Sequence, residues 1–130
     1  MIVRFKRKVN FYETDAQGIV HHSNYPRYFE EARGYYLENL GFPYSDIRNK
    51  LNTDIVILEI NINYRHPLVY GDSFEIITEL DIENRYFFNF RYTVKKKNET
   101  ISTGKTRHCC ISRSNKKMIP IPDELRNKLD

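Results

Sequence analysis

The chain of 130 residues contains no tryptophan and only two cysteines, and no apolar run in it is long enough to cross a bilayer. A membrane-spanning helix needs about 20 consecutive apolar residues, and the N-terminus also lacks the apolar segment of a signal peptide. We therefore expect a soluble, cytoplasmic protein. No internal repeat, low-complexity tract or linker interrupts the sequence, so we expect residues 1–130 to form a single domain.

The two cysteines, Cys109 and Cys110, are adjacent in the chain. Neighbouring residues of a strand point to opposite faces of a sheet, which disfavours a disulfide between them. Neither cysteine has ligand-type residues at the spacing of a metal site. We expect free thiols in a reducing compartment, with no bound metal and no cofactor.

Tyrosine and phenylalanine supply the 14% aromatic content, which is typical of a globular core and not of a disordered chain. The formal net charge is +4, and short lysine-rich clusters lie at residues 6–8, 95–97 and 116–117. Such clusters are typical of solvated turns or strand faces. A basic rim would also attract a ligand that carries several phosphates. We expect no nucleic-acid partner, because no nucleic-acid-binding motif is present.

The first part of the chain predicts a strand followed by a long helix. Apolar residues alternate over residues 3–11, and residues 23–40 have apolar positions at helical spacing, with Pro26 in the first turn. Gly41 ends this helix. Residues 44–51 indicate a second, short helix.

The remaining sequence predicts mainly strands, at residues 56–64, 74–82, 86–94 and 100–112, with a last helical turn after Pro122. In the first of these segments, alternation places five side chains on one face: Val56, Leu58, Ile60, Ile62 and Tyr64. One helix with a broad apolar face, followed by antiparallel strands, gives an α+β fold in which the sheet curls around the helix.

The turn around Asp15 carries the clearest chemical signal. This residue follows the first strand, shares a turn with Gly18 and precedes the long helix. A carboxylate near a helix N-terminus can attack a carbonyl or deprotonate water, while free backbone N–H groups stabilise the developing oxyanion. That combination suits acyl transfer from an ester or thioester. An aspartate that only caps the turn is the common alternative.

The segment Asp15-Ala16-Gln17-Gly18-Ile19-Val20, with His22, Asn24-Tyr25, Tyr28, Glu31 and Arg33 after it, resembles the signature of hotdog-fold acyl-CoA thioesterases. The resemblance is greatest to the 4-hydroxybenzoyl-CoA thioesterase family, in particular its bacterial branch associated with the Tol-Pal envelope system, and it extends over nearly the whole chain. It implies a hotdog fold, a long central helix wrapped by an antiparallel β-sheet. It also implies hydrolysis of acyl-CoA, in which CoA is part of the substrate.

The same resemblance assigns roles to individual residues. Asp15 is the implied nucleophile or general base, and His22 presents its backbone N–H to the thioester carbonyl. Gly18 allows a close approach of the substrate. The motif differs from the family pattern at Glu13, where an aspartate is usual, and at Gln17, where a small residue is usual, which leaves the size of the acyl group open.

Val20 and Tyr25 complete the expected substrate contacts near the motif, although Tyr25 is equally suited to packing in the core. Arg85 lies in a turn where the family contacts the CoA phosphates, and a solvated turn arginine is the alternative. We interpret His108, which lies on a predicted strand, as a hydrogen-bonded core residue.

Glu31 is close to the position of a catalytic glutamate in another hotdog branch. The alternative, which we favour, is a surface ion pair with Arg27 four residues earlier, and Arg33 is expected to pair similarly with Glu30.

The resemblance implies active sites between subunits, and hence a homodimer or homotetramer. We expect Val3, Phe5 and the aromatic face of residues 86–94 to be the apolar surface that drives association. A non-catalytic acyl-CoA-binding module is the principal alternative function. A hotdog dehydratase would need a catalytic histidine motif that the sequence lacks.

Overall fold

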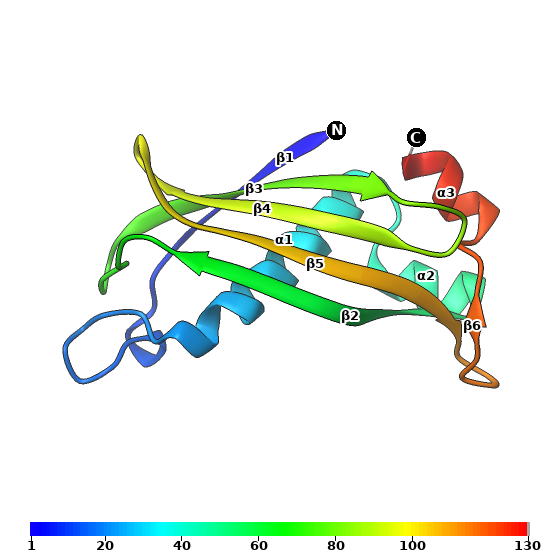
Figure 1. Cartoon of the computed structure of the whole chain (residues 1–130), viewed down its shortest axis with the longest axis horizontal. Coiled ribbons are helices and arrows are strands. Elements are labelled where there is room, and N and C mark those ends of the chain that lie inside the picture. Colours follow the sequence, from blue (N-terminus) through cyan, green and yellow to red (C-terminus); the bar gives the residue numbers. More distant parts are fainter. Residues whose placement is uncertain (130) are drawn as a thin grey trace.

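A computed structural model describes residues 1–129. It contains an antiparallel six-stranded sheet, with a long helix packed across one face (Figure 1). The strands are β1 (Ile2–Lys8), β2 (Thr53–Tyr64), β3 (Ser73–Ile82), β4 (Phe88–Lys96), β5 (Glu99–Ser112) and β6 (Met118–Ile119). The helices are α1 (Tyr25–Asn39), α2 (Tyr44–Leu51) and α3 (Asp123–Leu129), and short 3₁₀ turns cover Phe11–Glu13 and His22–Asn24. The α+β architecture expected from the sequence is confirmed.

The strand order is β1-β3-β4-β5-β2, and β6 pairs with β5. Strands β3, β4 and β5 follow one another as hairpins, whereas β1 and β2 occupy the two edges. The first strand is shorter than the alternation suggested. It ends at Lys8, and Phe11 lies in a 3₁₀ turn with its side chain 71% exposed.

Helix α1 packs closely on the sheet because β5 carries a glycine where the helix crosses it. The ring of Phe29 stacks on Tyr92 with centroids 4.1 Å apart. A Cβ atom at Gly104 would lie only 2.4 Å from Cε2 of Phe29. The Asn24 side chain does not cap α1, because it donates to the carbonyl of Glu13, at 2.8 Å.

A β-bulge at Leu58 corrects the predicted face of β2. Ile57 pairs with His108 and Glu59 pairs with Arg107, so β2 has one extra residue at Leu58. Residues opposite each other in a sheet share a face. Before the bulge, Ile55 and Ile57 therefore point toward the helix side, and Val56 does not.

Most of the surface expected to drive association is buried within the subunit, although Phe5 is only partly buried. Val3 and the β4 residues Phe88, Phe90, Tyr92 and Val94 all belong to the core. Several exposed apolar side chains instead lie along the edge strand β2. Ile57 is 48% exposed, Ile60 45% and Tyr64 52%.

Candidate active site

A largely enclosed arginine fixes the segment that leads into the Asp15 turn. Arg7 on β1 donates from Nη2 to both carboxylate oxygens of Glu13, at 2.7 and 2.6 Å. From Nη1 it donates to both oxygens of Glu31 on α1, at 2.7 and 2.8 Å. Glu13 also accepts from the Tyr28 hydroxyl and from the Asn10 N–H. Strand, turn and helix are thus joined through one guanidinium group.

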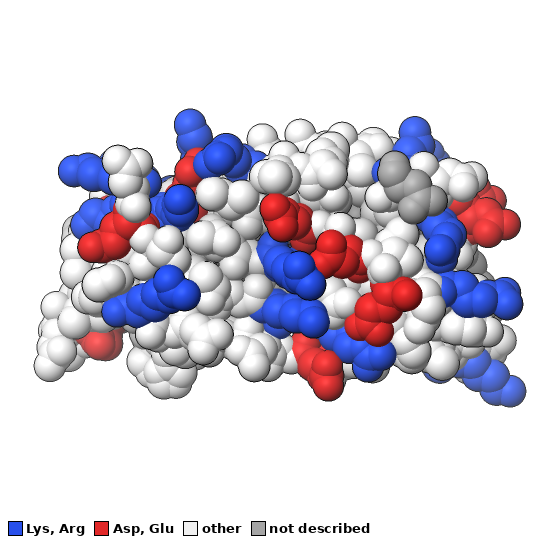
Figure 2. Space-filling view, turned by 45° about the horizontal axis from the view of Figure 1, so that its top comes forward, with Lys and Arg blue, Asp and Glu red and all other residues white. Residues whose placement is uncertain are grey.

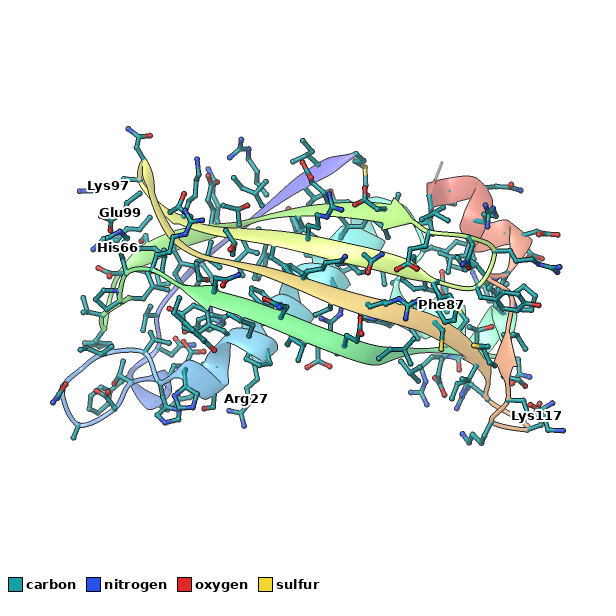
Figure 3. All side chains as sticks on the ribbon, viewed as in Figure 1. Arg27, His66, Phe87, Lys97, Glu99 and Lys117 are labelled. Carbon is teal, nitrogen blue, oxygen red and sulfur yellow. The ribbon has the colours of Figure 1, made fainter. Side chains whose placement is uncertain are left out.

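Both ion pairs expected on the surface of α1 are wrong. Glu31 pairs with Arg7 across the fold and not with Arg27, which projects outward from α1 (Figure 3). Arg33 is buried, and it donates to the hydroxyls of Tyr92 and Tyr44 instead of pairing with Glu30. Spacing along a helix shows which residues are neighbours on its surface, but it does not show which partners other elements bring.

The Asp15 turn is held against the loop between β2 and β3. Thr14 and Val20 form a bridge across its base, and the Asp15 N–H donates to the Ile19 carbonyl at 2.7 Å. Gly18 has a φ of 78°, a conformation that favours glycine. Its carbonyl accepts from the Tyr70 N–H at 3.0 Å.

The carboxylate of Asp15 has one oxygen engaged in the turn and one that is open. Oδ1 accepts from the N–H groups of Gln17 and Ile19, at 2.8 and 3.1 Å. Oδ2 has no hydrogen-bond partner among residues 1–129, and the side chain is exposed. The turn-capping role and a chemical role are therefore compatible, because the first uses Oδ1 and the second can use Oδ2.

A cavity of about 250 Å³ lies at the N-terminal end of α1. Val20, His22 and Tyr25 form one side of it, and the residues that follow β2, including His66, form the other. The N–H of His22 has no hydrogen-bond partner among the described residues. Burial, followed by the neighbouring Tyr64, raises the pKa of Tyr25 to about 12, so its hydroxyl stays protonated.

The side of this cavity formed by the end of β2 was not predicted as part of the site. Tyr64, Arg65 and His66 line it, and the Tyr64 hydroxyl donates to the His22 carbonyl at 3.4 Å. Pro67, which directly follows them, signalled the turn but not that this turn would meet the helix start. His66 is seen at the end of β2 in Figure 3.

Arg85 is not brought to the other predicted residues within one chain. It lies in the turn between β3 and β4, where its carbonyl accepts from the Ile121 N–H at 2.8 Å, close to α3. Figure 1 shows this turn and the Asp15 turn at opposite ends of the molecule. The guanidinium carbon of Arg85 lies 5.3 Å from the centroid of the Tyr86 ring.

A basic groove lies at the same end of the molecule as the Asp15 turn. It has a volume of about 510 Å³, and its lining includes Lys6, Lys8, Lys95 and Lys97. Figure 2 shows several basic side chains at this end, with acidic ones among them. Among residues 1–129, no group of three or more His, Cys, Asp or Glu side chains could hold a metal ion. No helix in that range is long and apolar enough to span a membrane.

The model of the thioesterase-like superfamily matches residues 9–129. The chain therefore belongs to the thioesterase-like superfamily, and the hotdog fold and the class of thioester hydrolase expected from the sequence are confirmed.

The similar proteins match this chain over most of its length. The crystal structure of a hypothetical protein from Aquifex aeolicus is 44% identical and has a TM-score of 0.92, covering 98% of this chain and 99% of that one. A 1,4-dihydroxy-2-naphthoyl-CoA hydrolase from Prochlorococcus marinus is 33% identical over 82% of this chain and 74% of its own. A DHNA-CoA thioesterase structure from Staphylococcus aureus is 26% identical with a TM-score of 0.90, covering 98% of this chain and 87% of that one.

Proposed function

We propose that the protein is an acyl-CoA thioesterase whose reaction takes place between Asp15 and the start of α1. One observation carries the proposal: the turn that holds the open oxygen Oδ2 of Asp15 leads directly to His22, which lines a cavity and has a free N–H, in a chain of a thioesterase superfamily. The His22 N–H and the positive end of the helix would polarise the thioester carbonyl.

Two routes use the same geometry. In the first, Oδ2 of Asp15 attacks the thioester carbon, the C–S bond breaks to release the CoA thiolate, and water then hydrolyses the resulting anhydride. In the second, Oδ2 accepts a proton from a water molecule that attacks the thioester carbon directly. Both routes give a free carboxylic acid and CoA.

An aromatic acyl group is the first candidate substrate. The cavity wall includes Tyr25 and Tyr64, whose rings meet edge to face with centroids 5.1 Å apart. The relatives named for 1,4-dihydroxy-2-naphthoyl-CoA act on an aromatic thioester. Membership of the 4-hydroxybenzoyl-CoA thioesterase family and its Tol-Pal-associated branch is part of the same proposal, supported by the Asp15–Val20 motif. A cytoplasmic location is also part of it, supported by the free thiols of Cys109 and Cys110, which suit a reducing compartment.

We also propose that the active unit is a homodimer, or a homotetramer built from it. The edge strand β2 presents unpaired backbone groups together with the exposed side chains of Ile57, Ile60 and Tyr64. Antiparallel pairing of β2 with the same strand of a second copy would cover them. It would also bring the Arg85 end of one subunit toward the Asp15 end of its partner.

The central test is Asp15→Asn, assayed by thiol release over short, long, branched and aromatic acyl-CoAs. Asparagine can keep the Oδ1 contacts with Gln17 and Ile19, so the turn is preserved while the charge is lost. We expect turnover to fall ~10²–10⁴-fold with acyl-CoA binding retained. Asp123→Asn, at the far helix α3, is the matched control and should be silent. Wild-type protein that binds acyl-CoA without turnover would favour the non-catalytic binding module.

The phosphates of CoA have two candidate anchors, and kinetics separates them. If the lysine groove holds them, Lys95→Gln combined with Lys97→Gln should raise KM with little change in kcat. If a partner subunit contributes Arg85, Arg85→Ala should raise KM instead, again with little change in kcat. An acyl thioester that lacks the nucleotide should be insensitive to either change.

A further inference from the structure

A second cavity, of about 270 Å³, lies between α1, α2 and the edge strand β2. It is distinct from the cavity at the helix start, and no residue lines both. Ile47, Ile55 and Ile57 contribute apolar surface to it. Its polar lining includes Arg33 and His108, together with Glu30, Tyr44, Arg48, Thr53 and Asp54.

Arg33 brings a positive charge into this cavity without a carboxylate to balance it. The side chain is 5% exposed. Nε donates to the Tyr44 hydroxyl at 3.4 Å and Nη1 donates to the Tyr92 hydroxyl at 3.0 Å. Nη2 has no acceptor among residues 1–129, and no ion pair to Arg33 occurs among them. A buried charge is costly unless it is paired, so this arrangement favours an anion from outside.

The hydrogen-bonded side chains that continue from Arg33 into the core are all neutral, so none of them is the missing anion. The Val56 carbonyl can only accept, so Nδ1 of His108, 3.2 Å away, carries a proton. Burial, followed by the neighbouring Arg33, lowers the pKa of His108 to about 4, and the ring is therefore neutral with Nε2 as an acceptor. Thr106 then donates to His108, and Tyr92 donates to Thr106, at 2.7 and 2.6 Å.

The chain of bonds therefore leads from Arg33 to a backbone carbonyl through neutral groups only. Of the two acidic residues at the cavity, one is paired with another arginine and the other is solvated. Asp54 accepts from Arg48 at 2.9 Å, and Glu30 is exposed to solvent. These two acids at the rim disfavour a multiply charged anion such as a phosphate, whereas the apolar wall suits the hydrocarbon part of an organic acid.

We propose that this cavity binds a small carboxylate, with the guanidinium of Arg33 as its partner. A planar guanidinium matches the geometry of a carboxylate, and charge-assisted hydrogen bonds of this kind are stronger than neutral ones. The carboxylate has two possible sources. It is either a free organic acid, or a carboxylate at the far end of an acyl group whose thioester lies in an active site. The second source rests on the proposed thioesterase function, and the first does not.

The first arm of the test measures binding by calorimetry on the complete chain, with benzoate as the probe and benzamide as its neutral counterpart. We expect benzoate to bind, benzamide not to bind, and Arg33→Gln to weaken benzoate at least about tenfold. Arg27→Gln, an exposed arginine on the same helix, should leave binding unchanged. Glu30→Gln removes an acid from the rim and should tighten it, which keeps the proposal testable if the Arg33 variant fails to fold.

The second arm compares succinyl-CoA with butyryl-CoA, which differ by a terminal carboxylate. We take the ratio of kcat/KM for succinyl-CoA to kcat/KM for butyryl-CoA. A ratio about tenfold lower in Arg33→Gln than in wild type assigns the carboxylate to the acyl group. An unchanged ratio, with benzoate binding lost, assigns it to a free acid. Benzamide binding as well as benzoate, or equal benzoate binding by wild type and Arg33→Gln, would overturn the proposal. So would benzoate binding that appears only in Glu30→Gln, because Glu30 would then be the counter-ion.

Discussion

Arg7→Met removes the guanidinium that joins β1, the turn before Asp15 and α1, while keeping a side chain of similar length. Four hydrogen bonds to two carboxylates are lost. Glu13, with 5% of its surface exposed, keeps only the Tyr28 hydroxyl and the Asn10 N–H as donors. The contact of the Arg7 guanidinium with the Tyr28 ring, 4.5 Å from its centroid, is lost as well.

The two carboxylates contribute unequally to the expected loss. The Glu31 side chain is 43% exposed, so its pair with Arg7 is worth no more than about 1 kcal/mol. The Arg7 and Glu13 side chains are 11% and 6% exposed, and removing one partner of such a buried pair costs about 3–5 kcal/mol. We expect the free energy of unfolding to fall by roughly 4 kcal/mol, and Tm by roughly 15 °C for a chain of this size.

Urea unfolding of Arg7→Met, Glu13→Gln and the double variant measures this coupling. The double variant should be less destabilised than the sum of the two single changes, because it leaves no buried charge unpaired. Arg4→Met is the matched control on the same strand, since Arg4 pairs with Glu75 while its side chain is 57% exposed. If Arg7→Met costs no more than Arg4→Met, Arg7 does not hold the turn in place.

Three further results are expected. Gly104→Ala should lower the free energy of unfolding by about 1–3 kcal/mol in urea titrations, because its Cβ would meet the buried Phe29 ring; a neutral result would refute the close approach. The pKa of His108 is lowered to about 4, so its neutral form favours the fold fully above pH 6.5. The free energy of unfolding should fall by roughly 3 kcal/mol as the pH falls from there to 4, and a His108→Gln variant should lack this pH dependence. The Arg107 hydrogen bond, followed by that of Asn89, lowers the pKa of Glu83 to about 2. The stability that Glu83 adds over Glu83→Gln should therefore persist above pH 5 and vanish as the pH falls toward 2.

The periodicity of the sequence predicted most of the fold because local patterns determine the elements. The short helix at residues 44–51 is confirmed as α2, and the strand at residues 74–82 is confirmed as β3 within one residue. What the pattern missed depends on distant partners. The bulge at Leu58 comes from its pairing with β5, and an apolar alternation carries no sign of an inserted residue. The sequence around Arg7 likewise carries no sign that the fold brings two carboxylates to it.

The local part of the candidate site was predicted from the sequence, and the part contributed by distant segments was not. A local motif was enough to place Asp15 in a turn before the helix, and the structure adds that only one of its oxygens is used by the turn. The far wall of the cavity comes from the end of β2, about 40 residues later in the chain. Arg33 was expected on the surface because its helical neighbour Glu30 suggested a pair, yet its burial is determined by α2 and β4.

The order of the strands has a consequence for how the protein is made. Strand β1 pairs only with β3, so Ile2 lies opposite Glu79, which is far from it in the sequence. Strand β2 pairs with β5. Strand β1 has no partner until β3 has emerged from the ribosome, and β2 has none until β5 has emerged; such distant pairings slow folding. The segment that carries Asp15 is among the first to leave the ribosome, but its scaffold is complete only after β3 has been synthesised.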